Sequence, residues 1–129
     1  MIPYLIWDED NRVEIRSVEE LEQLLDLLTV EAREDIPLSV ELHVEEGISM
    51  YIVVGGEASP IAFYSATSRP PVIGGLGQYN NTDETIEYNH RGHYSVIRKQ
   101  YAVPIVAARE AFRQFFQTRK RPNNIAWEY

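Results

Sequence analysis

Apolar residues follow two different periods in the first half of the chain, and each period predicts one kind of element. From Ser17 to about Arg33 they recur every three or four positions behind a capping box, which predicts a helix. Three later runs alternate apolar and polar residues, which indicates strands with one buried face. These runs span residues 38–46, 48–54 and 61–66. Because only short turns separate them, we expect an antiparallel meander whose apolar face packs on the helix.

Two hairpins are predicted from pairs of short runs that are joined by turn residues. Residues 4–7 and 12–16 flank an Asp-Glu-Asp-Asn turn, and residues 85–89 and 94–98 flank an Arg-Gly turn. Between the meander and the second hairpin, residues 67–82 follow neither period, and they contain Pro-Pro and Gly-Gly pairs. We therefore expect a long loop there, and loops of this length are usually functional or mobile.

A second helix and a final strand complete the predicted fold. Pro104 is expected to open the helix in the first-turn position that proline favours, and the helix should end near Thr118. Residues 125–129 are expected to form a last strand. The prediction is a single α+β domain over residues 1–129, in which two main helices pack on one face of an antiparallel sheet meander.

Length and composition exclude several classes of protein. A chain of 129 residues without cysteine is long enough for one core and carries no disulfide, thiolate zinc site or cysteine nucleophile. No apolar run approaches the roughly 18 residues that span a bilayer. The first residues also lack the basic region and the cleavage site of a signal peptide. We therefore expect a cytoplasmic protein with no membrane partner.

The charge is divided unevenly along the chain. The net charge is −8, but residues 1–57 hold 15 acids against 3 bases and residues 58–129 hold 5 acids against 9 bases, which gives −12 and +4. An acidic balance argues against nucleic acid as a partner, because phosphates attract basic surfaces. The acidic half is either a solvated surface that favours solubility or a field that attracts a basic partner.

Local motifs give little support for catalysis, metals or cofactors. His90 and His93 have the spacing of half a metal site, but no third ligand is evident. Residues 74–77 (Gly-Gly-Leu-Gly) lack the Gly-Lys-Ser/Thr of a phosphate-binding loop, so a turn that needs positive φ is the plainer interpretation. Glu45 and Glu46 point to opposite faces of a strand and make a poor acid–base pair. We expect no catalytic residue, no metal and no cofactor.

The outward face of the predicted meander is the best candidate for a recognition surface. Tyrosines and charged groups that stand together on an exposed sheet are suited to binding a protein, although an ordinary wetted sheet face has the same composition. The candidate partner-binding residues are Glu41, His43, Glu45, Tyr51 and Tyr64 on this face, with Tyr79, Asp83 and Glu84 beyond it.

From residue 65 onward the sequence resembles a known family. The resemblance rests on Ser65 to Arg69, Gly74-Gly75-Leu76 leading to Tyr79, Val103-Pro104 before an alanine-rich helix, Thr118 to Pro122, and a terminal Ile125-Ala126-Trp127. This order is similar to the first immunity-protein family of bacterial polymorphic toxin systems. Its members are small α+β cytoplasmic proteins that are encoded beside toxins, often nucleic-acid deaminases, which they bind and neutralise.

The resemblance assigns structural rather than binding roles to the residues that carry it. Where the family usually has a glycine after the second helix, this chain has Arg119, although glycine is the easiest left-handed cap. The matching residues are expected to start the helix, allow close packing, end the helix and fill the core. These residues are Gly74, Gly75, Pro104, Ala108, Phe112, Pro122 and Trp127.

The resemblance and the charge division predict the same function. A toxin that acts on DNA or RNA is basic around its active site, and an acidic inhibitor complements it. The resemblance therefore implies an immunity protein, a monomer or a homodimer, that occludes the active site of a cognate toxin with a basic surface. Two other classes stay open: a small acidic secretion chaperone that holds an effector segment, and an enzyme with an unrecognised carboxylate site.

Overall fold

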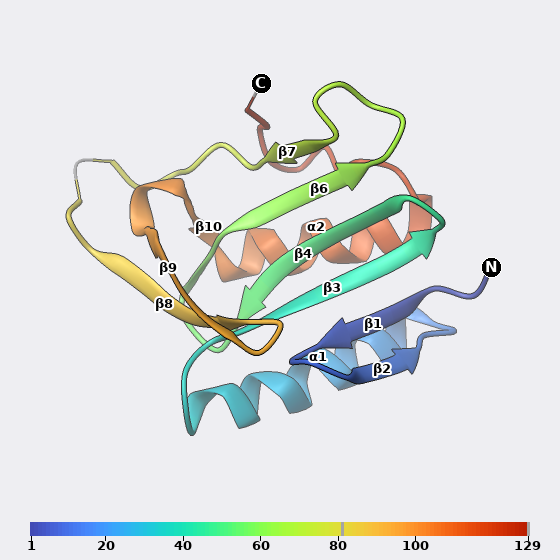
Figure 1. The fold of residues 1–129 in the computed structure, drawn as a ribbon, viewed down its shortest axis with the longest axis horizontal. Helices are drawn as coiled ribbons and strands as arrows, with labels where there is room; N and C mark the ends of the chain where they lie inside the picture. The colour runs from blue at the N-terminus through green and yellow to red at the C-terminus, as the bar shows by residue number, and fades with distance from the viewer. Residues whose placement is uncertain (81, 129) are drawn as a thin grey trace.

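The computed structural model describes residues 1–80 and 82–128 and contains two helices (Figure 1). These are α1 (Val18–Arg33) and α2 (Ile105–Thr118), and a short 3-10 helix, η1 (Lys99–Tyr101), precedes α2. The strands are β1 (Tyr4–Trp7), β2 (Asn11–Glu14), β3 (Leu38–Glu45), β4 (Ile48–Val54), β5 (Ala58–Ser59), β6 (Ile61–Ser65), β7 (Val72–Gly74), β8 (Thr85–His90), β9 (His93–Arg98) and β10 (Val103–Pro104). Neither of the helices in the described part of the chain is long and apolar enough to cross a membrane.

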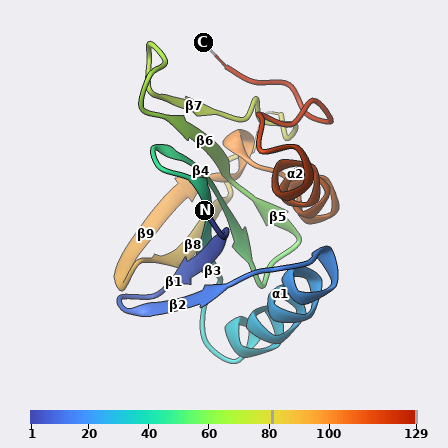
Figure 2. The same cartoon turned by 90° about the vertical axis from the view of Figure 1, so that its right-hand side faces the viewer.

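Both main helices lie on the same side of one large sheet, which confirms the predicted α+β class (Figure 2). The sheet runs in the order β2-β1-β3-β4-β6-β7, and all of these neighbours are antiparallel. Apolar residues of β3 and β4 alternate into the core beneath the helices, as expected; the fully buried ones are Val40, Leu42, Val44, Met50, Ile52 and Val54.

The first helix forms where the sequence predicts it. The Ser17 side chain accepts a hydrogen bond from the backbone N–H of Glu20, and the Glu20 carboxylate accepts one from the N–H of Arg16. These bonds satisfy donors that a helix N-terminus leaves free. Leu21, Leu25 and Leu28 line the buried side of the helix. The capping box fixes where the helix begins, and the leucine spacing fixes which side of the helix faces the core.

The second helix ends at Thr118, as predicted, but it begins just after Pro104. Pro104 lies just before the helix, in extended conformation as the last residue of β10, and not in the first turn. At the other end Arg119 takes the left-handed conformation, with φ of 61°. Its guanidinium donates to the carbonyl oxygens of Val44 (3.2 Å) and Met1 (3.4 Å). These contacts hold a non-glycine residue where glycine would be the easier cap.

Two predictions for the irregular segments are wrong. The expected loop over residues 67–82 contains β7, which pairs with β6 at the edge of the sheet. Residues 125–128 form only one isolated bridge, between Trp127 and Gly75, and Tyr129 lies outside the described residues. Neither element shows an alternation long enough to distinguish it from its surroundings, since β7 has three residues and the bridge only one.

The hairpin of β8 and β9 has a position that the sequence pattern does not predict. Its strands pair as expected around Arg91 and Gly92, which both have positive φ. The hairpin lies across the sheet on the face opposite the helices, and β8 meets β3 at Leu38 (Figure 2). The pattern places Ser39 and Val53 on the outward face, but both are almost completely buried, and His90 of the hairpin contacts Ser39.

Candidate functional site

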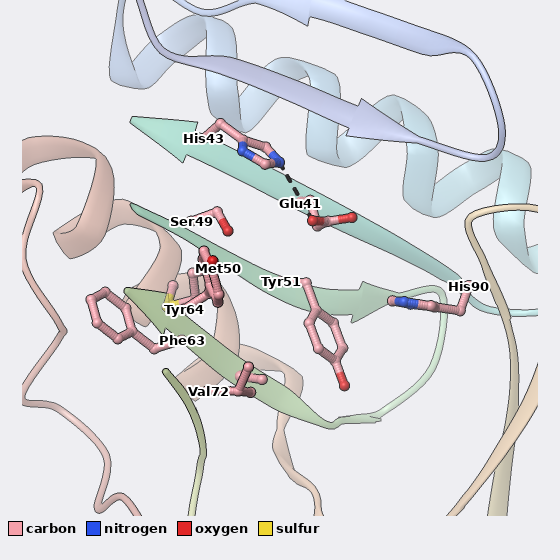
Figure 3. A pocket seen from close by; sticks show the side chains of 10 residues that line it. Glu41, His43, Ser49, Met50, Tyr51, Phe63, Tyr64, Val72 and His90 are labelled. Carbon is pink, nitrogen blue, oxygen red and sulfur yellow. Dashed lines mark ion pairs between the residues drawn. The ribbon is translucent and has the colours of Figure 1, made fainter. Parts of the chain in front are cut away.

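The part of the outward face that the hairpin leaves open is hollowed into a groove of about 360 Å³. Side chains from β3, β4 and β6 form its floor, with contributions from β7 and β8 at its sides (Figure 3). The lining is mainly aromatic and aliphatic, with polar groups gathered near β3. Of the predicted partner-binding residues, the structure brings together Glu41, His43, Tyr51 and Tyr64 in this groove.

Glu41 is the charged centre of the groove. One of its carboxylate oxygens lies 2.8 Å from Arg91 Nη1 at the hairpin turn, and the other lies 3.4 Å from His43 Nε2. The polar contact with His43 has the largest effect and lowers the pKa of Glu41. Partial burial raises this pKa, and Arg91 lowers it again. Together these effects bring the pKa of Glu41 to about 2. Glu41 is therefore ionised at neutral pH, and it ties the hairpin to the sheet.

The contacts of Glu41 with Arg91 and His43 should stabilise the fold only while this carboxylate is charged. Because its pKa in the fold is below the value of about 4.3 in an unfolded chain, the stabilisation is present above pH 4.3 and is lost as the pH falls toward 2. Glu41→Gln should therefore lower the free energy of unfolding by about 1–2 kcal/mol at pH 7 and by much less near pH 2. Urea unfolding across this pH range measures the difference.

Glu45→Gln is the matched control for this experiment, because Glu45 is exposed and has no ion-pair partner among the described residues. Its free energy of unfolding should follow that of the wild type at every pH. A Glu41→Gln variant that is as stable as the wild type at pH 7 would contradict the role given to this carboxylate.

Aromatic contacts hold two further side chains of the groove, His43 and Tyr51. The His43 ring lies parallel to that of Tyr4, with centroids 4.9 Å apart. Tyr51 meets His90 edge to face at 5.3 Å, and burial, followed by the neighbouring Tyr88, raises the pKa of Tyr51. Tyr51 is therefore a neutral hydrogen-bonding group at physiological pH. Tyr64 is less enclosed, and 37% of its surface is exposed.

The histidines of the hairpin turn have separate environments. His90 Nδ1 lies 3.1 Å from Ser39 Oγ, within the contact between hairpin and sheet. His93 is exposed at the start of β9. No group of three or more metal-ligating side chains occurs in residues 1–80 and 82–128. What the groove offers chemically is an apolar floor, hydrogen-bonding aromatic groups and one charged carboxylate, which is suited to binding a side chain or a loop of another protein.

The other predicted partner-binding residues lie outside the groove. Glu45 is exposed at the end of β3, and Asp83 is exposed before β8. Tyr79 and Glu84 come together at Lys99, whose Nζ lies 4.9 Å from the Tyr79 ring centre and 3.1 Å from a Glu84 oxygen. The structure thus divides the predicted set into a groove and a separate cluster.

Two residues that shape the groove are absent from the predicted set. By sequence Arg91 is only a turn residue and His90 only half of a metal site, yet both contact the open face of the sheet. The alternation of Ile86, Tyr88 and His90 was a usable signal, because it marks one side of the hairpin as fit for burial.

The residues that carry the family resemblance lie mostly in the core. Ala108 and Phe112 of α2 are fully buried, and Pro122 accepts a hydrogen bond from the Trp127 indole (2.8 Å). A side chain on Gly75 would overlap that of Ile61. Gly75 is therefore needed for close packing, and neither it nor Gly74 has the positive φ that the turn interpretation required.

The two oppositely charged halves of the chain meet between the helices. Arg109 of α2 lies 2.7 Å from a Glu22 oxygen and 2.8 Å from an Asp26 oxygen of α1. Part of the acidity of the first half is therefore neutralised within the molecule. Exposed acids that have no ion-pair partner among the described residues remain beside the groove at the β3–β4 turn, where Glu45 and Glu46 lie.

Comparison with known proteins identifies the family. No curated protein matches the chain. The family model described as immunity protein Imm1 matches residues 9–129. This range includes every element from β2 to α2 and all the residues that line the groove. The match thus covers nearly the whole chain, and it agrees with the resemblance that the second half shows. The chain belongs to the Imm1 immunity protein family.

Proposed function

We propose that this immunity protein binds a cognate toxin that acts on nucleic acid, of the deaminase type, and neutralises it by covering the active site. The observation that carries the proposal is the groove on the open sheet face, where exposed Tyr64 and partly exposed Tyr51 lie beside a charged carboxylate. Buried aromatic side chains dominate the affinity of many protein interfaces. The protein acts by occupancy in the cytoplasm of the producing cell and needs no catalytic group.

Charge supports this choice of partner. A toxin that grips phosphates presents a basic surface, and an acidic inhibitor accelerates encounter with it. Glu41 is already paired with Arg91 inside the fold, so it contributes little long-range field. The free acids at the β3–β4 turn, Glu45 and Glu46, are the better steering groups, because they are exposed at one end of the groove strands.

The experiment measures the association rate between the purified chain and the toxin that is encoded beside its gene. The rate should fall as salt is added, and Glu45→Lys should slow association about 3- to 10-fold at low salt. Glu31→Lys is the matched control, because Glu31 is also exposed but lies on α1, on the opposite side of the sheet. It makes the same change in net charge away from the groove.

Three results would count against the proposal. The absence of a complex would exclude neutralisation of that toxin by binding. An association rate that is insensitive to salt would exclude electrostatic steering. Equal slowing by Glu45→Lys and Glu31→Lys would show that net charge alone matters and would remove the support for the groove.

A further inference from the structure

Strand β2 forms an open edge of the large sheet, and its backbone has groups ready to pair (Figure 1). Among the described residues, β2 pairs only with β1. The N–H of Ile15 donates to the carbonyl of Pro3 (2.9 Å), so by the alternation of an antiparallel ladder the backbone groups of Val13 also face β1. The N–H and C=O groups of Arg12 and Glu14 therefore point away from the sheet, toward solvent.

The space beside this edge is apolar. Val13 and Ile15 of β2 share a crevice of about 300 Å³ with Leu24 and Leu27 of α1. Val13 is 41% exposed, although it stands opposite the buried Leu5 on the core side of the sheet, and Leu27 of α1 is 55% exposed. The helix thus extends past the last strand and has apolar side chains that no strand covers. One more strand at this edge would cover them, as an ordinary sheet and helix layer does.

The sequence of β2 is complementary to itself. Arg12 and Glu14 flank Val13 symmetrically, and both lie on the face away from α1. If two copies of β2 met antiparallel with Val13 at the two-fold axis, each Arg12 would stand opposite Glu14 of the other copy. Those positions carry the outward backbone groups, so each pair would exchange both hydrogen bonds while oppositely charged side chains meet. The two valines would face each other above Leu24 and Leu27.

We propose that the chain forms a homodimer by antiparallel pairing of β2 with β2 of a second copy, centred on Val13. The backbone register, the alternating charges and the apolar crevice are three separate observations that this one arrangement satisfies. Charged residues on an edge strand usually prevent pairing. Here the charges are of opposite sign at the positions that would meet, so they favour it. The interface borders one side of the open-face groove, because the Arg12 guanidinium lies 3.6 Å from the centre of the Tyr4 ring, which stacks on His43. The pairing itself does not depend on the proposed toxin binding.

The absence of cysteine from the chain allows a direct test with Val13→Cys. Opposed residues of a non-hydrogen-bonded antiparallel pair have Cα atoms about 4.5 Å apart, which a disulfide can bridge. Under mild oxidation, Val13→Cys should form a covalent dimer at least about tenfold faster than Val106→Cys, since pairing holds the two thiols together. Val106 is 78% exposed on α2 and is the matched control.

Sedimentation of chains without cysteine supplies the second measurement. The mass should rise from 14.9 kDa toward twice that value between about 5 and 500 µM. Arg12→Glu should weaken association about tenfold, because it sets carboxylates opposite each other in both symmetry-related pairs. Arg12→Glu combined with Glu14→Arg should restore it to within about threefold of the wild type.

Failure of either measurement overturns the proposal. A chain that keeps a mass of 14.9 kDa up to about 500 µM has no such dimer. Equal cross-linking of Val13→Cys and Val106→Cys, or a double charge exchange that does not restore association, would place any dimer interface elsewhere. A chain that stays monomeric alone and uses this edge only with a basic segment of another protein would likewise contradict self-pairing.

Discussion

Tyr64→Arg should weaken the complex with the toxin about 100-fold or more and abolish protection of cells that express the toxin. Tyr64 projects from β6 into the groove and keeps 37% of its surface exposed, so its side chain is available to a partner. Truncation of a central aromatic residue in an interface commonly costs about 2 kcal/mol or more, which corresponds to about 30-fold in affinity. The added positive charge would also repel the basic surface that we propose for the toxin, which increases the loss further.

The same exchange at Tyr94 is the control for this prediction. Tyr94 is 65% exposed on β9, and its side chain is on the face of the hairpin turned away from the sheet. Tyr94→Arg should therefore change the affinity less than about threefold. Calorimetric titration of both variants measures the affinities, and their melting temperatures show whether the fold is kept. A Tyr64→Arg variant with the affinity of the wild type would exclude the groove as the binding surface.

Phe112→Ala should lower the free energy of unfolding by about 3–5 kcal/mol, a larger loss of stability than Glu41→Gln should cause. Phe112 of α2 is fully buried in the hydrophobic core. Its removal leaves a cavity that the surrounding core fills only partly. Since domains of this size have a total of about 5–15 kcal/mol, the variant will be marginally stable and its protection of cells should fall with it.

Denaturant unfolding of Phe112→Ala beside Val106→Ala measures this effect. Val106 lies on the same helix but is 78% exposed, so its loss should change the free energy of unfolding by less than about 0.5 kcal/mol. The pair separates core packing from helix propensity, because both exchanges introduce alanine into α2. A Phe112→Ala variant within about 1 kcal/mol of the wild type would show that the core does not depend on this side chain.

The sequence was sufficient for elements whose patterns are long. The leucine spacing after Ser17 and the eight-residue alternation of β3 gave α1 and the central strands nearly residue by residue. In such segments the apolar residues keep the same spacing over several helical turns or several strand positions. Only one face of the element can then be buried. Both helices therefore had to pack on the same side as the apolar face of the meander, as they do.

The remaining part of the fold depends on contacts between distant segments, which local patterns do not encode. Arg91 and Glu41 are 50 residues apart, and nothing near either of them indicates that a hairpin turn will meet β3. The outward face was therefore predicted as open along its whole length, whereas Ser39, which His90 of the hairpin contacts, and Val53 are buried. The groove is what remains, and for this reason only four of the eight predicted partner-binding residues line it.

The charge division also has a different meaning in three dimensions. By composition alone, the acidic first half is either a solvated surface or a field that attracts a basic partner. In the structure, Arg109 binds Glu22 and Asp26 across the helices, and Arg91 binds Glu41 across the sheet. Part of the charge thus joins the two halves to each other. The acids left for a basic partner are those at turns and helix ends, such as Glu45 and Glu46.

The groove on the open sheet face is, in this proposal, where the immunity protein holds its toxin. Hydroxyl-radical footprinting of tyrosines, with and without the cognate toxin, tests this most directly because it reports on side chains. Binding should lower the oxidation rate of Tyr64 by about fivefold or more, while Tyr94 and Tyr101, both exposed outside the groove, react as before. An unchanged rate at Tyr64, with protection at Tyr94 or Tyr101 instead, would contradict the proposal.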